Sequence, residues 1–318
     1  MSEFDVVVVG ELNVDLILQD VSSLPEMGKE KLAEGMELTM GSASAILASN
    51  LARLGVRVGF AGKLGRDRFA EVVLATLEER GVDTGGITQD ADARTGITVS
   101  MTFPDNYAMV TYMGVMEEYS LEEVPLDYVL QGRHLHLSSF YLQPGLRPGC
   151  AELFQRAKEA GLSTSFDPGW DPQEEWAADI KDVLPFVDVF LPNEQEALSI
   201  SDQSTVAAAI SELGGYSPVV VIKQGSGGAV CLAEGESIKT GIYTVNSVDT
   251  TGAGDSFNAG FLYEWLGGKD IHQSLKSGSA CGALATTKLG GSTASPTIQE
   301  LESFLDEYRD EPIFVDQA

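Results

Sequence analysis

Two features of the chain predict an α/β fold with three layers, in which helices cover both faces of a central and mostly parallel sheet. Short apolar segments alternate with helical segments along most of the 318 residues, and this alternation is typical of parallel sheets with right-handed crossovers. The apolar segments are continuous, which indicates strands that are buried on both faces. Two segments break this pattern and predict a small additional sheet that forms a lid.

The expected buried strands are short apolar segments at 5–9, 58–61, 133–137, 163–166, 187–191 and 218–222. The expected helices lie at 43–54, 67–80, 147–160, 193–200 and 204–213, and a stretch rich in Gly, Ala and Ser at 254–288 is also expected to be helical. No repeat or polar linker divides the sequence, so residues 1–318 are expected to form a single domain.

The lid is expected to be formed by two insertions, at about 14–40 and 95–113. These residues alternate apolar and polar side chains without a helical period, which predicts antiparallel, half-exposed strands, with residues 104–106 as a turn. An apolar lid face is expected to pack on substrate or on the same sheet of a second copy, which would give a homodimer. The residues assigned to this face are Met101, Phe103, Met109 and Tyr112.

Composition excludes several classes of partner. The net charge is −28, from 48 acidic and 20 basic side chains, and such a surface repels nucleic acid and anionic membranes. The sequence has no apolar run of about 18 residues, the length that a membrane span needs, and its start lacks the features of a signal peptide. Cys150, Cys231 and Cys281 are far apart. An odd count without metal-ligand spacing is typical of the reducing cytoplasm.

The segment VDTTGAGDSF at 248–257 has the residue types that phosphoryl transfer requires. Gly252, Ala253 and Gly254 form a small-residue turn before a helix, where backbone N–H groups and the helix dipole can hold an anion. Asp255 follows in the first turn, where a carboxylate could accept the proton of an attacking hydroxyl. Acidic residues are also common at this place as helix caps, so the GAGD pattern alone leaves both roles open.

The longer string VDTTGAGDSFNAGF resembles the second signature of the ribokinase-like (PfkB) carbohydrate kinase family. Further pieces agree with this family in order and spacing over roughly residues 5–305. The resemblance implies a ribokinase-like fold, ATP as the phosphoryl donor and Mg²⁺ as its companion ion. It also implies that Asp255 is the general base and that the backbone of Gly252–Gly254 is the anion hole.

Two N-terminal motifs resemble the acceptor-binding segments of the family. In GELNVD at 10–15, the resemblance implies that Asn13 and Asp15 bind substrate hydroxyls; a turn cap is the alternative. In GSASAILASNLARLG at 41–55, it implies that Gly41 and Ser42 contact substrate. The family's second glycine is replaced by Ser42 and its sugar-binding Asn by Ile46, a difference that indicates a different or less polar acceptor, although helix packing explains Ile46 more simply.

Asn193 and Glu196 match the family's NxxE motif, which implies that they help to hold Mg²⁺ and its water shell. A helix capping box gives the same residue pattern. The Asp249 carboxylate, with backbone carbonyls near Thr251 and Gly290, matches the position of a monovalent-cation site and implies K⁺.

The segment KQGSGG at 223–228 resembles the family's nucleotide-side loop. The resemblance implies that Lys223, Gly225 and Gly228, together with Thr251, contact ATP. A β-hairpin turn would explain the same glycines and is compatible with that role. His134 and His136 lie on an expected strand and are interpreted as structural.

The acceptor is expected to be a small neutral sugar or polyol. The segment FDPGWDP at 166–172 lacks the Asn and Arg that sugar-acid members often have, and 95–118 lacks the Lys and Arg that a sugar phosphate would need. A nucleoside is the alternative, because a base could stack on side chains of the expected lid: Met101, Phe103, Tyr107, Met109, Tyr112 and Met113. A non-catalytic sugar-sensing protein is the alternative from another class. The GxGxxG of dehydrogenases and the GxxxxGK[ST] of P-loop kinases are absent.

Overall fold

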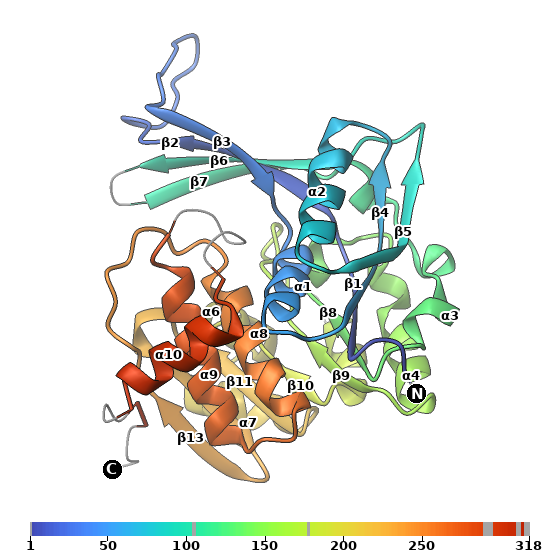
Figure 1. Cartoon of the computed structure of the whole chain (residues 1–318), viewed down its shortest axis with the longest axis vertical. Helices are drawn as coiled ribbons and strands as arrows, with labels where there is room; N and C mark the ends of the chain where they lie inside the picture. Colours follow the sequence, from blue (N-terminus) through green and yellow to red (C-terminus); the bar gives the residue numbers. More distant parts are fainter. Residues whose placement is uncertain (1, 104–105, 177–178, 289–294, 310–312, 315–318) are drawn as a thin grey trace.

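The computed structural model describes residues 2–103, 106–176, 179–288, 295–309 and 313–314. Strands in this part of the chain form a nine-stranded sheet and a separate four-stranded sheet. Helices cover both faces of the larger sheet, and the smaller sheet projects from one end of it (Figure 1). The predicted three-layer α/β architecture with a small additional sheet is therefore confirmed.

The larger sheet has the order β13-β12-β11-β10-β9-β8-β1-β4-β5. From β11 to β5 each neighbouring pair is parallel, and β12 and β13 add antiparallel strands at one edge. The parallel strands are mostly continuous runs of buried residues, as strands covered on both faces must be. Their bounds are β1 Val6–Val9, β4 Val58–Gly65, β5 Asp83–Asp90, β8 His134–Leu137, β9 Ser163–Phe166, β10 Val189–Phe190 and β11 Val219–Lys223; the antiparallel strands are β12 Ala229–Ala233 and β13 Glu236–Thr240.

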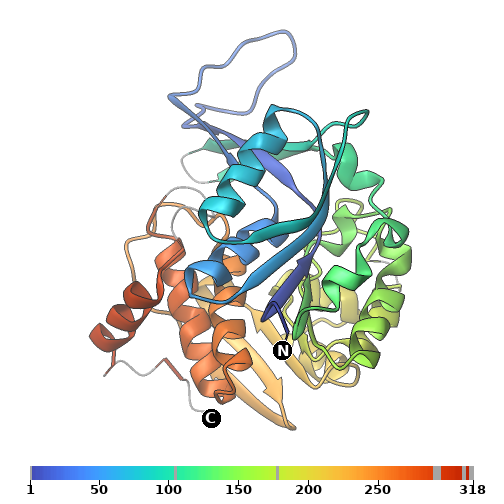
Figure 2. The same ribbon diagram turned by 45° about the vertical axis from the view of Figure 1, so that its right-hand side comes forward.

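Two layers of helices enclose this sheet (Figure 2). One core contains side chains of α1 (Ala43–Arg53), α2 (Arg68–Glu79) and α8 (Ala253–Leu266), and α9 (Ile271–Ala285) packs beside α8. The core on the other face contains side chains of α3 (Leu126–Val129), α4 (Cys150–Glu159), α5 (Ile180–Val183), α6 (Glu194–Ser201) and α7 (Val206–Leu213). A third core lies between α9 and α10 (Ile298–Glu307). No helix among the described residues is long and apolar enough to cross a membrane.

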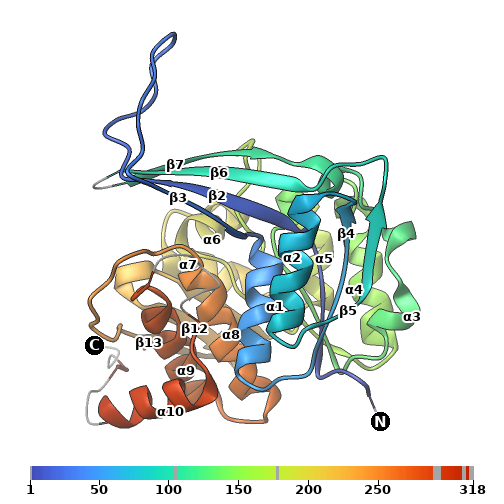
Figure 3. The same ribbon diagram turned by 45° about the horizontal axis from the view of Figure 1, so that its top comes forward.

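The smaller sheet has the order β3-β2-β6-β7, with β2 Asn13–Gln19, β3 Gly35–Met40, β6 Gly96–Phe103 and β7 Asn106–Tyr112. We call it the lid sheet, after its place at one end of the molecule (Figure 3). The expectation that all of its strands are antiparallel is wrong for β2 and β6, which pair in parallel. Both strands continue from parallel strands of the larger sheet, β1 and β5, and therefore run in the same direction. Residues 104–105 of the expected turn lie outside the described residues.

Strand register gives the lid sheet one polar and one apolar face. Asp15 is in register with Thr39, Thr98 and, through β6, Thr111, and all four side chains point to the face that carries Asn13. The opposite face is apolar and contains Leu16, Leu18, Met36, Leu38, Val99, Met101, Phe103, Val110 and Tyr112. The assignment of Met109 to the apolar face is wrong, because Met109 pairs with Ser100 and shares the polar face.

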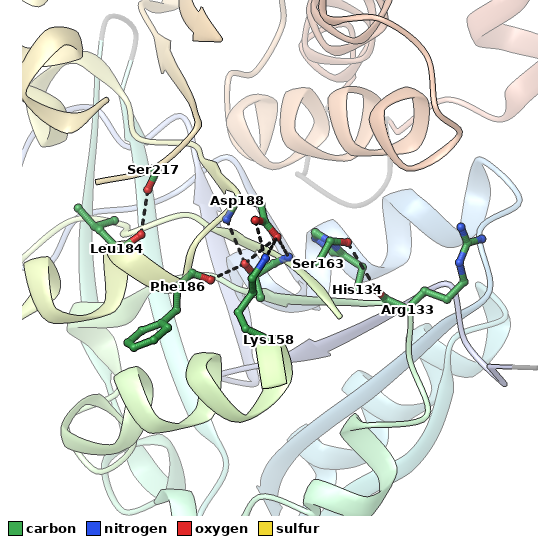
Figure 4. A network of polar contacts seen from close by, with 9 residues as sticks. Arg133, His134, Lys158, Ser163, Leu184, Phe186, Asp188 and Ser217 are labelled. Carbon is green, nitrogen blue, oxygen red and sulfur yellow. Dashed lines mark hydrogen bonds and ion pairs between the residues drawn. The ribbon is translucent and has the colours of Figure 1, made fainter. Parts of the chain in front are cut away.

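A column of buried polar side chains crosses the larger sheet. His134 bonds to Ser163 (2.8 Å) and Ser165 (2.6 Å), and His136 bonds to Ser165 and Ser138 (both 2.7 Å). Figure 4 shows one end of this column, where Ser163 meets His134 beside the ion pair of Lys158 and Asp188. Burial lowers the pKa of His136 to about 3 and that of His134 as well. Both rings are therefore neutral, in agreement with the structural role expected for them.

Candidate active site

Polar side chains gather where the parallel strands end. Asn13 follows β1, Asp167 follows β9, Asn193 follows β10, and Lys223 is the last residue of β11. The carboxyl ends of parallel strands lie along one edge of a sheet, which is the usual binding edge of open α/β folds. The sequence folds these segments so that residues far apart in the chain share one site.

The glycine turn before α8 has the backbone shape that an anion hole needs. Gly252 is the N-cap residue with φ 70°, a left-handed conformation that glycine adopts without strain. Asp255 lies in the first helical turn, where backbone N–H groups have no intrahelical partner. A Cβ at Gly254 would be 3.7 Å from Nζ of Lys223. The Ala253 N–H donates to the Thr250 carbonyl at 3.2 Å. The turn brings the other first-turn N–H groups, a lysine ammonium group and the Asp255 carboxylate together.

Lys223 is held beneath this turn by two partners. Its Nζ donates to Oδ2 of Asp167 at 2.6 Å and to Oδ1 of Asn258 at 3.1 Å. Nδ2 of Asn258 donates to the same Asp167 oxygen at 2.5 Å. Burial disfavours both charges and is the largest single influence on Asp167, but Lys223 and the hydrogen bonds from Asn258 and Gly169 together lower the pKa of Asp167. Nearby carboxylates raise the pKa of Lys223. The pair is therefore charged, with its geometry fixed by Asn258.

This triad is not predicted from the sequence, since neither Asp167 nor Asn258 is among the expected site residues. They are 91 residues apart in the chain. Their role depends on a contact between β9, β11 and α8 that no local spacing encodes.

Asp255 has the electrostatic environment of a proton acceptor. Removal from water raises its pKa to about 8, the Asp167 carboxylate adds to this shift, and Lys223 opposes it. A base whose pKa lies close to the working pH combines substantial ionisation with a strong affinity for a proton. Because Glu11 also raises the pKa of Asp255, the acceptor-side motif at 10–15 lies within electrostatic range of the glycine turn.

Asn13, Asp15 and Gly41 meet at the junction between the lid sheet and α1. A Cβ at Gly41 would lie 2.2 Å from Oδ1 of Asp15 and 2.9 Å from Oδ1 of Asn13, so only glycine fits there. Asn13 donates to Oγ1 of Thr98 at 2.9 Å. Burial raises the pKa of Asp15 to about 6, and a hydrogen bond from Asn13 opposes that shift. At neutral pH this carboxylate is mostly ionised and can accept hydroxyl hydrogen bonds.

Ser42 has a φ of 72°, a left-handed conformation that is strained for serine and unstrained for glycine. Its Oγ accepts from the backbone N–H of Ala45 at 3.0 Å and so caps α1. The same Oγ donates to the backbone carbonyl of Glu11 at 2.6 Å. These two bonds offset a backbone strain of about 1–3 kcal/mol. Ile46 is buried in the helix, as expected from packing.

Glu11 is an acceptor-side residue that the sequence did not single out, although it lies inside the GELNVD motif. Its buried carboxylate accepts from Oγ of Ser44 at 2.5 Å and from the backbone N–H of Ser44 at 3.3 Å. Burial raises its pKa, and the hydrogen bonds from Ser44 and Ser139 oppose that shift. Glu11 therefore joins the end of β1 to the start of α1.

Asn193 and Glu196 form the capping box of α6. Oδ1 of Asn193 accepts from the Glu196 N–H at 2.9 Å, and the Glu196 carboxylate accepts from Nδ2 and the backbone N–H of Asn193 at 2.7 and 2.8 Å. Burial, together with the Asp167 carboxylate, raises the pKa of Glu196 to about 7. The described residues contain no group of three or more His, Cys, Asp or Glu side chains that could enclose a metal. One amide and one carboxylate suit Mg²⁺, which keeps several waters and binds substrate phosphates.

The loop after Lys223 is a β-hairpin turn, as the structural interpretation expected. Gly225 has φ 54° and Gly228 has φ 85°, and a Cβ at Gly228 would lie 2.0 Å from the Thr240 carbonyl oxygen. Thr251 is exposed beside the glycine turn and donates from its N–H and Oγ1 to Oδ1 of Asp249, at 2.9 and 2.8 Å. Gly290, the remaining residue of the expected cation site, lies outside the described residues.

Comparison with known proteins identifies the family. The pfkB family carbohydrate kinase model matches residues 3–298. The ATP-dependent ribose-1-phosphate kinase of Halopiger xanaduensis is 32% identical over 303 residues, which cover 94% of this chain and 97% of the relative. The fructokinase of Vibrio alginolyticus is 30% identical over 315 residues, with 94% and 98% covered.

Solved structures agree. The fructokinase of Vibrio cholerae O395, in its fructose, ADP and calcium ion bound form, is 27% identical with a TM-score of 0.79, covering 96% of this chain and 100% of that one. Together with the matching fold and the glycine turn before Asp255, these similarities show that the chain is a sugar kinase and belongs to the pfkB family of carbohydrate kinases.

Proposed function

We propose that this protein transfers the γ-phosphoryl group of ATP to a hydroxyl of a small neutral sugar or polyol, with Asp255 as the general base. The observation that carries the proposal is the placement of Asp255 in the first turn of α8, beside Gly254 and Lys223. Asn13 and Asp15 at the lid junction provide the hydrogen-bonding groups for the acceptor.

Each group has one task in the reaction. The Asp255 carboxylate takes the hydroxyl proton as the acceptor oxygen forms its bond to the γ-phosphorus, and the bond to the β–γ bridging oxygen breaks to release ADP. The backbone N–H groups of the Gly252–Gly254 turn form the anion hole and, with the Lys223 ammonium group, offset the charge on the transferred group. Gly225, Gly228 and Thr251 border the nucleotide.

Mg²⁺ would neutralise phosphate charge when bound, and Asn193 and Glu196 would hold it through its water shell. We also assign Asp249 and the backbone near Thr251 to a monovalent cation, with K⁺ as the candidate. The buried, unpaired cysteines are compatible with a cytoplasmic location.

The lid sheet favours a polyhydroxylated acceptor over a nucleoside. Its polar face carries hydroxyl groups, and Oγ1 of Thr98 bonds to Asn13 and to Oγ1 of Thr111, both at 2.9 Å. Met101, Phe103 and Tyr112, which could have stacked on a base, are on the opposite face. Tyr107 and Met109 alone, of the candidate stacking residues on the described strands, share the face of Asn13.

A sugar phosphate is the second candidate, because the Halopiger relative bears the name ribose-1-phosphate kinase. The side chains of the acceptor site argue against it. The Asp15 carboxylate is mostly ionised at neutral pH, and the described strands of the lid sheet carry no Lys or Arg. A phosphate on the acceptor would therefore meet charge repulsion on the lid side.

The test is a phosphorylation screen with Mg·ATP and separate acceptors: D-ribose, D-fructose, a sugar alcohol, a keto-deoxy sugar acid, ribose 1-phosphate and adenosine. We expect ADP release with a neutral sugar or polyol. Activity confined to adenosine or to ribose 1-phosphate would replace the proposed acceptor. ATP turnover that no acceptor stimulates, together with binding of a sugar, would identify a sensor instead of an enzyme.

The metal assignment predicts that Glu196→Gln raises the Mg²⁺ concentration needed for half-maximal rate. Gln preserves the capping box but removes the negative charge that attracts the hydrated ion. The matched control is Glu194→Gln in the same helical turn, whose carboxylate bonds to Gln224 instead. Titration of the rate with Mg²⁺ checks this. If both variants have the wild-type Mg²⁺ dependence, Glu196 acts only as a cap.

The apolar face of the lid sheet predicts a homodimer. Met36 on one edge strand is 66% exposed, and Val110 and Tyr112 on the other edge strand are 66% and 57% exposed, which is unusual for apolar side chains that share one sheet face. We propose that the same face of a second copy covers them, in an isologous interface. Val110→Glu should then convert a dimer to a monomer in light scattering, whereas Leu130→Glu, at the end of α3, should not. A wild-type monomer, or a dimer that survives Val110→Glu, would contradict this interface.

A further inference from the structure

One buried hydrogen bond connects the acceptor-side helix to the catalytic helix. Nδ2 of Asn50, in α1, donates to Oγ of Ser256, in α8, at 2.9 Å. The two residues are 206 positions apart in the chain. Both side chains are buried, with Asn50 2% and Ser256 0% exposed. Among the described residues it is the side-chain hydrogen bond that joins α1 to α8.

Each end of this bond lies close to a different half of the site. Ser256 follows Asp255 directly, and its backbone N–H donates to the Gly252 carbonyl at 2.9 Å, so it belongs to the first turn of α8. Asn50 lies in α1, and the start of α1 carries Ser42 and Ser44, which bind Glu11. The bond therefore spans the interface between the helix that carries the base and the helix whose start binds Glu11.

Stability alone does not explain an asparagine at this place. Its amide oxygen has no hydrogen-bond partner among the described residues, although it is buried. Burial of an unpaired polar group is unfavourable, so an apolar side chain of similar size would suit the interior better. The hydrogen bond to Ser256 is the contact that explains a polar side chain at this position.

This bond makes the contact between α1 and α8 depend on the relative orientation of the two helices. Apolar packing between α1 and α8 is not directional and tolerates small shifts. A hydrogen bond weakens steeply when its angle or length changes. In α8, Gly260 is already in tight contact with α9, where a Cβ would lie 2.5 Å from the Ser277 carbonyl oxygen. Between α1 and α8, the Asn50 bond is the directional contact between side chains of the described residues.

We propose that Asn50 is a positioning residue of this kinase. Through Ser256 it holds the first turn of α8, and with it Asp255, in register with the acceptor-side residues at the start of α1. The inference rests on the proposed role of Asp255 as the base. A small displacement of a base from the reacting hydroxyl lowers the rate of proton transfer without removing any group that binds ATP.

The experiment uses Asn50→Leu, which removes the donor at similar volume, Ser256→Ala, which removes the acceptor, and the double variant. Ser49→Ala is the control, because Ser49 is buried next to Asn50 and its hydroxyl has no partner among the described residues. Values of kcat, KM and Tm are measured with Mg·ATP and the member of the acceptor panel that the wild-type protein phosphorylates fastest.

We expect each single substitution to lower kcat about 10- to 100-fold, a typical cost of a misplaced reactive group. KM for ATP should change by less than about twofold. The kcat of the double variant should be no lower than that of the more impaired single variant, because both substitutions break the same bond. Ser49→Ala should have wild-type kcat.

Wild-type kcat in a folded Asn50→Leu protein, or losses that multiply in the double variant, would overturn the proposal. A lowered Tm with unchanged kcat would show that the bond is only structural. If Asn50→Leu does not fold, Ser256→Ala decides alone by the same criteria. The assignment of Asp255 as the base is tested separately, and turnover retained by Asp255→Asn would contradict it.

Discussion

Asp255→Asn is expected to lower kcat by about 10²–10⁴-fold, the usual contribution of a positioned general base. Asn has nearly the same shape and keeps the first turn of α8 intact, but it cannot accept the hydroxyl proton. KM for ATP should change little, because the backbone of the glycine turn and Lys223 remain in place. Steady-state kinetics with varied ATP and acceptor provide the measurement.

The same substitution is expected to stabilise the folded protein at neutral pH. The folded-state pKa of Asp255 is raised to about 8 from an ordinary value of 3.8. Between these values the folded state binds a proton that the unfolded state has lost, so stability falls as pH rises through this range. Asn carries no such dependence. The Tm difference between variant and wild type should therefore grow from about pH 4 to about pH 8.

This combination separates a base from a helix cap. A first-turn acid stabilises its helix through the dipole, so its loss would lower Tm and leave kcat near the wild-type value. A catalytic base at a destabilising position gives the opposite result, with lower activity and higher stability. Near wild-type turnover in Asp255→Asn would refute the proposed mechanism.

Lys223→Met is expected to reduce kcat by about 10²–10³-fold, similar to the loss of one oxyanion-hole donor. Its ammonium group lies next to Gly254 and is the positive charge that opposes the pKa shift of Asp255. Without it the pKa of Asp255 rises further, so a smaller fraction of the base is ionised at neutral pH. The acid limb of the pH profile of kcat/KM should therefore move to higher pH.

The control for this variant is the double substitution Lys223→Met/Asp167→Asn. Lys223→Met alone leaves the buried Asp167 carboxylate without its ion-pair partner, which costs about 3–5 kcal/mol of stability. Asp167→Asn removes the unpaired charge, so the double variant should recover Tm but not kcat. Recovery of kcat together with Tm would show that Lys223 serves the fold and not the reaction.

The larger sheet was predictable because its strands are buried on both faces and appear as continuous apolar runs such as VVVV at 6–9. Strands β5, β12 and β13 were not predicted. β5 and β13 are the edge strands of the larger sheet, and their side chains, as in DTGGITQD at 83–90, lack that apolar run. β12 is an apolar run, AVCLA, that lies between β11 and β13. The parallel pairing of β2 and β6 depends on the direction in which two distant strands leave the larger sheet, and local alternation contains no information about that direction.

The candidate site was predictable where one motif contains both the backbone shape and the reactive group, as in the GAGD turn. Residues that act through contacts between distant segments were missed. Glu11 depends on Ser44 of α1, and Asp167 depends on Lys223 of β11 and Asn258 of α8. The two-residue period of a strand places Met109 and Tyr112 on opposite faces of the lid sheet. Only the register with β6 shows that Tyr112, and not Met109, shares the face of Met101.

Acceptor-dependent ADP release is the measurement that tests the central claim most directly. Wild-type protein and Asp255→Asn are incubated with Mg·ATP, with and without a neutral sugar from the panel, and the acceptor is analysed by mass spectrometry. We predict that the wild type releases one ADP for each sugar that gains a phosphoryl group, and that Asp255→Asn yields almost none. ADP release without a phosphorylated acceptor, or equal product from both proteins, would contradict the proposed kinase mechanism.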